Sequence, residues 1–110
     1  MSDSLLVRGG RIVDPSQEID AVGDVLIRDG IVSSVSLGGQ KNVALHDSTI
    51  LEATGLVVSP GFIDLHCHLR EPGSEEKETI ATGALAAVNG GFTTLCVMPN
   101  TEPPLDTAPL

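Results

Sequence analysis

The stretch GFIDLHCHLREPG, residues 61–73, joins an apolar strand pattern to two histidines and an arginine at two-residue spacing. Its first eight residues are almost continuously apolar, which is typical of a strand covered on both faces of a parallel sheet. Side chains two residues apart on a strand share a face. His66, His68 and Arg70 are therefore predicted to project together, with Asp64 one step behind them.

The residues that follow complete a strand–helix–strand unit. "EPGSEEKE", residues 71–78, predicts a loop, and a helix is predicted to begin between Ser74 and Thr79 and to end at Asn89. "FTTLCVM", residues 92–98, predicts a second strand. Two strands joined by one helix form a βαβ unit with a parallel pair, so the fold class is α/β. The apolar helix residues recur at spacings of four: Ile80, Ala84 and Val88, with Ala81 and Leu85 alongside.

Residues 1–58 instead carry the signals of short strands and tight turns, and we expect an antiparallel β unit. "SLLVRGGRIVD", residues 4–14, predicts two strands around a glycine pair. "GDVLIRDGIVSSVS", residues 23–36, predicts a hairpin, because an Asp-Gly pair suits the positive φ angles of a type I′ turn. "LGGQKN", residues 37–42, predicts a loop, and "STILEATGLVVSP", residues 48–60, predicts two further short strands.

Composition and charge exclude several function classes. The chain has 110 residues, 41% of them hydrophobic, which suits one domain with a modest core. Its net charge of −9, with six basic against 15 acidic residues, argues against binding to nucleic acid or anionic membranes. We expect neither a signal peptide nor a membrane-spanning helix. Cys67 and Cys96 lie in apolar runs, which favours reduced thiols in a cytoplasmic protein.

The polar residues of the opening stretch suit metal and carboxylate binding. Two imidazoles about 6.6 Å apart along a strand can converge on one zinc ion. Asp64 is predicted either to support such a ligand or to cap the local backbone. Arg70 suits a substrate carboxylate, with Asn100 of "VMPNT" as its candidate partner. The plainer alternatives are solvated or structural histidines, a solvated arginine and a turn asparagine; His46 is interpreted as a surface residue.

Four segments together resemble the N-terminal portion of the dihydroorotases of the amidohydrolase superfamily. They are "GDVLIRDGIVSSV", "GLVVSPGFIDLHCHLREPG", "KETIATGALAAVNGGFTT" and "VMPNT", in the expected order. The resemblance implies part of a β-sandwich-type small domain over residues 1–58. It implies that residues 59–110 begin a metal-dependent (β/α)₈ TIM barrel, truncated after strand one, helix one, strand two and a loop.

The same resemblance implies a reaction and a set of site residues. The family interconverts N-carbamoyl-L-aspartate and dihydroorotate in pyrimidine (UMP) biosynthesis, as a zinc-dependent cyclic amide hydrolase. His66 and His68 resemble its zinc ligands, and Arg70 and Asn100 resemble the pair that holds the substrate carboxylate. The carboxylated lysine, two further histidines and the acid/base aspartate come from later barrel strands, so no catalytic residue is expected in this segment.

A complete barrel takes about 250 residues, and this chain carries two of the eight strands. The small domain is expected to be incomplete too, since in this superfamily it also takes strands from the far end of the chain. We therefore expect an inactive segment of a dihydroorotase that holds zinc weakly or not at all. The complete enzyme is expected to hold one or two zinc ions and to form a homodimer or associate with aspartate transcarbamoylase.

Three other readings remain open at this stage. Allantoinases and dihydropyrimidinases share the fold and the His-x-His pattern, but their substrates lack this carboxylate, so Arg70 favours dihydroorotase. A non-catalytic scaffold for aspartate transcarbamoylase would usually lose metal ligands, and both His66 and His68 are present. A free-standing β module that binds a partner would explain residues 1–58 but not the βαβ unit.

Overall fold

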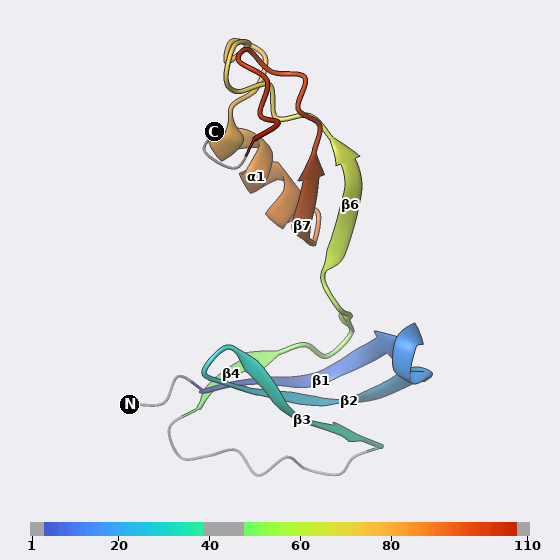
Figure 1. Ribbon diagram of the computed structural model, residues 1–110. Coiled ribbons are helices and arrows are strands. Elements are labelled where there is room, and N and C mark those ends of the chain that lie inside the picture. Colours follow the sequence, from blue (N-terminus) through green and yellow to red (C-terminus); the bar gives the residue numbers. More distant parts are fainter. Residues whose placement is uncertain (1–3, 39–47, 108–110) are drawn as a thin grey trace. The chain divides into compact units, whose positions relative to one another are not determined.

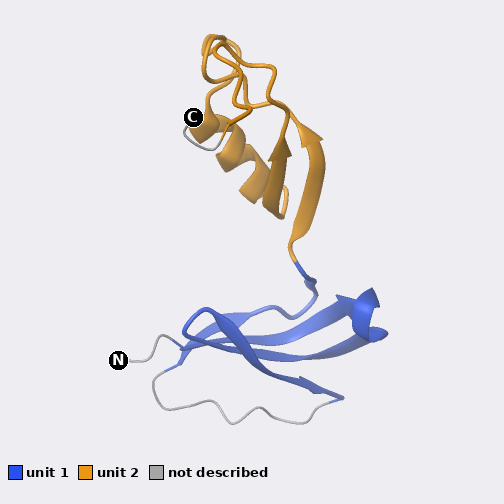
Figure 2. Ribbon diagram, viewed as in Figure 1, with its two compact units in different colours: residues 1–60 blue, residues 61–110 orange. Residues whose placement is uncertain are grey.

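The computed structural model describes residues 4–38 and 48–107, and the chain divides into two compact units. Unit 1 spans residues 1–60 and unit 2 spans residues 61–110 (Figure 2). Most of the loop predicted over residues 37–42, and His46, lie outside the described residues. Within those residues, no helix is long and apolar enough to cross a membrane.

Unit 1 is a β-sheet built around its first strand. The strand order is β3-β2-β1-β4, and β5 also pairs with β1 (Figure 1). A single 3₁₀ turn, Pro15–Gln17, joins the first two strands. The strands are β1 Ser4–Asp14, β2 Ile19–Arg28, β3 Ile31–Leu37, β4 Thr49–Glu52 and β5 Val57–Val58.

Two expectations for unit 1 were wrong. Residues 4–14 form one strand rather than two, because a register shift between Val7 and Gly10 absorbs the glycine pair without ending the ladder. The sheet is mixed rather than antiparallel, since β4 and β5 both run parallel to β1. The short strands β4 and β5 pair with β1 and not with the preceding β3. Local turn patterns cannot predict this pairing, because the partners are far apart in the sequence.

The predicted hairpin is confirmed. β2 and β3 pair antiparallel, with Arg28 opposite Ile31, and the turn residues between them both have positive φ, 50° at Asp29 and 77° at Gly30. A type I′ turn requires positive φ at both positions, and its twist matches that of the flanking strands. Among the buried hydrophobic residues of unit 1, Val7, Ile12, Val25 and Ala53 pack together in one cluster.

Unit 2 contains the predicted strand–helix–strand order. β6, Phe62–Cys67, pairs parallel with β7, Phe92–Val97, and α1, Ile80–Asn89, connects them. The helix ends at Asn89 as predicted but begins at Ile80, one residue after the predicted range. Thr79 is its N-cap and exchanges hydrogen bonds with Thr82 in a capping box. Two strands and one helix do not close a barrel within the described residues.

The apolar residues of unit 2 remain largely exposed. No residue between 61 and 107 is buried, although β6 and the helix carry the apolar patterns described above. Leu65 of β6 is 74% exposed and Val88 of α1 is 69% exposed. A pair of parallel strands needs other elements packed on both faces. Unit 2 therefore has more apolar side chains than its own strands and helix can bury.

Candidate functional site

The two histidines lie at the carboxyl end of β6. His66 belongs to the strand and His68 follows its last residue. The ring centroids are 5.3 Å apart and the ring planes meet at 68°. The backbone N–H of His66 donates to Asp64 Oδ1 over 3.0 Å, so this carboxylate is engaged with the strand's own backbone. The imidazoles are thus adjacent, and Asp64 caps the strand beside them.

Asn100 lies against the second histidine. Its Oδ1 is 2.9 Å from His68 Nδ1, across the two neighbouring strand ends. The pairing of the strands continues up to this contact, since the Met98 N–H donates to Cys67 O over 2.9 Å. Parallel neighbours deliver their carboxyl ends side by side, which explains how residues 32 positions apart meet here. The sequence predicted Asn100 as a partner of Arg70, and it did not predict the contact between Asn100 and His68.

Arg70 is placed by a tight turn and not by the strand. β6 ends at Cys67, so strand alternation does not extend to Arg70, and the prediction that it shares the histidine face by alternation does not apply. Its φ is 63°, in the left-handed region, and the Glu71 N–H donates to Leu69 O over 2.7 Å around it. A non-glycine residue in this region is uncommon and is often found at functional sites.

The Arg70 side chain is available to a ligand. The residue is exposed, and its guanidinium forms no ion pair within residues 4–38 and 48–107. The turn that carries it is held at both ends, since the Ser74 N–H donates to Arg70 O over 2.9 Å and the Glu102 N–H donates to Pro72 O over 3.0 Å. An anchored backbone with a free cation suits recognition of an anion.

Glu71 fixes this turn to the helix and was not singled out from the sequence. Its Oε2 accepts the Ile80 N–H, at the first residue of α1, over 2.7 Å. The first four N–H groups of a helix lack partners within it, and the positive end of the helix dipole favours a carboxylate. Two acids closer to the helix in sequence make other contacts: Glu78 accepts from the Thr82 hydroxyl, and Glu75 Oε1 accepts the Gly73 N–H, which lowers the Glu75 pKa. Glu71 lies nine residues before Ile80, too far along the chain for a local helix-capping pattern to predict this bond.

The donor set fits part of a zinc site. Zinc prefers imidazole nitrogens in a tetrahedral set of four, and the two adjacent rings offer two of them. In the described part of the chain, no three His, Cys, Asp or Glu side chains gather closely enough to hold a metal ion. His66 and His68 could therefore hold zinc firmly only with ligands supplied from elsewhere.

Cys67 lies between the two histidines but is not suited to the same chemistry. Its Sγ is 3.8 Å from Cys96 O, and both cysteines are free thiols. Partial desolvation raises the pKa of the Cys67 thiol, and the negative charge of Asp64 raises it further. The thiolate is the nucleophilic and metal-binding form, and a raised pKa disfavours that form at Cys67.

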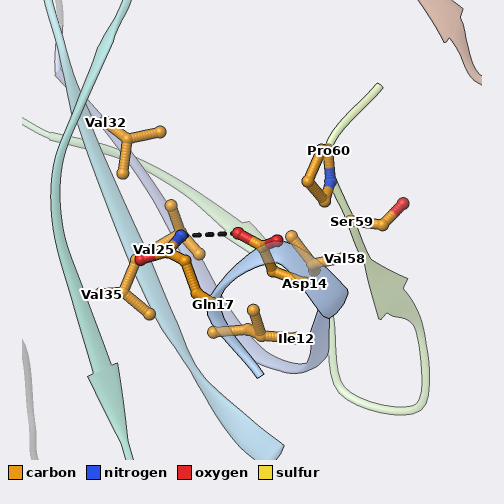
Figure 3. Close-up of a pocket in the computed structure, with 9 residues that line it drawn as sticks. All are labelled: Ile12, Asp14, Gln17, Val25, Val32, Val35, Val58, Ser59 and Pro60. Carbon is orange, nitrogen blue, oxygen red and sulfur yellow. Dashed lines mark hydrogen bonds between the residues drawn. The ribbon is translucent and has the colours of Figure 1, made fainter. Parts of the chain in front are cut away.

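A separate pocket of about 270 Å³ lies in unit 1 (Figure 3). Its one carboxylate belongs to Asp14, which accepts from the Ser16 N–H, from the Ser16 hydroxyl and from Gln17 Nε2. These bonds lower the pKa of Asp14. None of the predicted site residues lines this pocket, whose walls are Ile12, Asp14, Gln17, Val25, Val32, Val35, Val58, Ser59 and Pro60.

Comparison with known proteins places this geometry in context. The Dihydro-orotase-like family matches residues 55–109. A dihydroorotase from Anaeromyxobacter dehalogenans (strain 2CP-C) is 53% identical over 108 residues, which cover 98% of this chain and 24% of that protein. A dihydroorotase from Aquifex aeolicus (strain VF5) is 45% identical over 102 residues, covering 93% of this chain and 23% of that protein.

A solved structure agrees at the level of the backbone. The L-hydantoinase (dihydropyrimidinase) from Arthrobacter aurescens matches with a TM-score of 0.74 and 28% identity, over 97% of this chain and 23% of that one. The chain thus spans about a quarter of the length of the curated relatives it matches.

Proposed function

This chain belongs to the dihydroorotase-like family of amidohydrolases, and we propose that it supplies the first part of the active site of a zinc-dependent dihydroorotase. Such an enzyme interconverts N-carbamoyl-L-aspartate and dihydroorotate in pyrimidine biosynthesis. By "complete enzyme" we mean a polypeptide that contains this chain together with the further length its relatives possess. Residues 1–58 form part of a small β domain, and residues 59–110 begin a (β/α)₈ barrel with β6, α1 and β7.

The observation that carries this proposal is an exposed arginine, without an ion pair in the described part of the chain, in the turn that follows the histidine pair. Arg70 follows His68 by two residues, stands in a left-handed turn that is anchored to α1 through Glu71, and is exposed. Guanidinium pairs with a carboxylate through two parallel hydrogen bonds, which fixes the carboxylate in direction as well as in position. Dihydroorotate carries such a carboxylate on the same ring as the cyclic amide that is hydrolysed.

Each residue has a role in this proposal. His66 and His68 hold zinc, which when bound supplies polarisation of the amide carbonyl and a more acidic water. Arg70 and Asn100 hold the substrate carboxylate and so orient the ring. Asp64 keeps the end of β6 in place through the His66 backbone. The remaining ligands and the acid/base group come from parts of the complete enzyme outside these residues.

The setting of the complete enzyme is also a proposal. Free thiols at Cys67 and Cys96 suit the reducing cytoplasm. Its partner is the small-molecule substrate, and a homodimer or an association with aspartate transcarbamoylase remains part of the same hypothesis. A formal charge of −9 disfavours nucleic acid and anionic membranes as partners.

A dihydropyrimidinase is the alternative with a specific observation in its favour, namely the backbone match to the Arthrobacter hydantoinase. Identity is lower there, 28% against 53% for a dihydroorotase. The substrate of a dihydropyrimidinase lacks a ring carboxylate, so an anchored arginine beside the histidines would have no partner in it.

A matched pair of substrates separates the two functions. Dihydroorotate and dihydrouracil differ only in the ring carboxylate, so kcat/KM of the complete enzyme should favour dihydroorotate by about 100-fold or more. Initial rates of ring opening on both compounds provide the measurement. Faster turnover of dihydrouracil would overturn the dihydroorotase proposal in favour of the alternative.

The chain alone should behave differently from the complete enzyme. With two imidazoles as its zinc ligands, the purified 110-residue chain should retain well under one zinc per chain after dialysis and should not turn over carbamoyl aspartate. Metal analysis and a turnover assay measure both properties. Stoichiometric zinc together with measurable turnover would contradict the assigned ligand set.

A further inference from the structure

One contact joins the metal half of the site to the carboxylate half. Asn100 Oδ1 lies 2.9 Å from His68 Nδ1, and the Asn100 side chain is otherwise exposed. Its Nδ2 has no hydrogen-bond partner among the residues that the structure describes. One end of this amide is therefore engaged by the imidazole, and the other end is open.

The chemistry of the imidazole decides which end of the amide must face it. A neutral imidazole carries one proton, so a ring that ligates a metal through Nε2 carries its proton on Nδ1. That Nδ1–H needs an acceptor, and the amide oxygen is the group placed opposite it. If the amide were reversed, Nδ1 would accept from the NH₂ group and Nε2 would carry the proton, which would prevent it from binding zinc.

The same orientation fixes the chemistry of the open end. With its oxygen on His68, Asn100 presents two N–H donors and no acceptor on its other side. A carboxylate is an acceptor of hydrogen bonds at both oxygens, so the open end of Asn100 is matched to the anion that Arg70 is proposed to bind. A ligand carbonyl oxygen could also accept a hydrogen bond from this NH₂ group. A ligand ammonium group has only donors, so it could not form a hydrogen bond with it.

We propose that Asn100 sets Nε2 as the metal-binding atom of His68 through its oxygen. This orientation leaves its nitrogen to face the carboxylate that the proposed function already assigns to Arg70 and Asn100. The proposal rests on the proposed function for the identity of the substrate. Its His68 half rests on the observed contact and on the proposal that His68 binds zinc, and it does not depend on which substrate the enzyme takes. Asn100 acts as a positioning residue toward the metal and as a binding residue toward the substrate.

Two substitutions separate the two ends. Asn100→Asp keeps an oxygen acceptor for His68. It replaces the NH₂ donor with a carboxylate oxygen, which would repel the substrate carboxylate. Asn100→Ala removes both ends. Asn89→Ala is the matched control, because Asn89 is an exposed asparagine whose Nδ2 donates to Leu85 O at the end of α1. Asn100 is exposed as well, so neither change disturbs a buried core.

The metal end is tested without substrate in the complete enzyme. In wild type and Asn100→Asp, ¹⁵N NMR of metal-free protein with neutral, labelled histidine should show the His68 proton on Nδ1, and in Asn100→Ala it should shift toward Nε2. Zinc affinity, measured by competition with a chelator, should fall by about 10- to 100-fold in Asn100→Ala and stay near wild type in Asn100→Asp and Asn89→Ala. An unchanged tautomer with unchanged zinc affinity in Asn100→Ala would overturn the metal half.

The substrate end is tested with zinc at saturation. KM for dihydroorotate should rise at least tenfold in both Asn100 variants, most in Asn100→Asp, while kcat changes less and Asn89→Ala matches wild type. An unchanged KM in Asn100→Asp would overturn the substrate half. The result also separates failure of this inference from failure of the proposed function. If the enzyme does not turn over dihydroorotate but the His68 half is correct, the variants would still show the expected tautomers and zinc affinities.

Discussion

At the scale of single residues, the site depends on backbone conformation as much as on residue type. His66 and His68 could be placed together from strand spacing alone, because β6 holds the first and ends just before the second. Arg70 could not, because its position comes from a left-handed turn at φ 63°. Local backbone hydrogen bonds around Arg70 and the bond from the first N–H of α1 to Glu71 hold the turn in this uncommon conformation.

Asp14 provides a test of residue-level electrostatics in unit 1. Hydrogen bonds from Ser16 and Gln17 lower its pKa below the usual 3.8. A depressed folded-state pKa stabilises the native state at pH values above the unfolded pKa, and this stabilisation is lost as pH falls through the folded pKa. Asp14→Asn should therefore unfold at lower urea than wild type near pH 6. The difference should shrink below about pH 4, and a difference that is constant down to pH 2 would contradict the assigned bonds.

At the scale of elements, local signals predicted what local contacts determine. The Asp29-Gly30 hairpin and the parallel pairing of β6 with β7 follow from turn chemistry and the βαβ rule, and both are observed. The predicted end of the helix at Asn89 is observed as well. The parallel pairing of β4 and β5 with β1 was missed. Strand partners far apart in sequence are selected by packing across the sheet, which has no short-range signature.

The hairpin turn can be tested through its glycine. Gly30 has φ 77° and no neighbour that would meet an added Cβ, so Gly30→Ala adds conformational strain without a clash. We expect a loss of about 1 kcal/mol in the free energy of unfolding, measured by urea denaturation. Ser33→Ala, at an exposed position of β3, is the control and should change it by less than about 0.5 kcal/mol. A Gly30→Ala variant as stable as the control would contradict the type I′ turn.

At the scale of the whole molecule, the two units differ in how far they bury their apolar residues. Every buried hydrophobic residue in the described ranges belongs to unit 1: Leu6, Val7, Ile12, Val25, Leu26 and Ala53. Unit 2 carries the apolar patterns of a strand covered on both faces and of an amphipathic helix, without that burial. This asymmetry fits a chain that spans about a quarter of the length of its relatives.

Amide exchange should report this asymmetry directly. In the 110-residue chain, amides of β1 and β2 should exchange more slowly than those of β6 and β7 by about 10-fold or more, because opening of a strand pair without buried side chains costs little. Mass spectrometry of peptides from each unit measures both rates under one condition. Equal protection in the two units would mean that unit 2 has a core of its own, contrary to the burial described above.

The central proposal is that Arg70 binds the carboxylate of dihydroorotate and that His66 and His68 bind zinc. The most direct test is KM for dihydroorotate in the complete enzyme with Arg70→Ala, compared with Arg28→Ala at an exposed arginine of β2. Loss of a charged hydrogen-bonding partner should raise KM by about 10- to 100-fold, with zinc content unchanged. A KM equal to that of wild type and of Arg28→Ala would contradict the account.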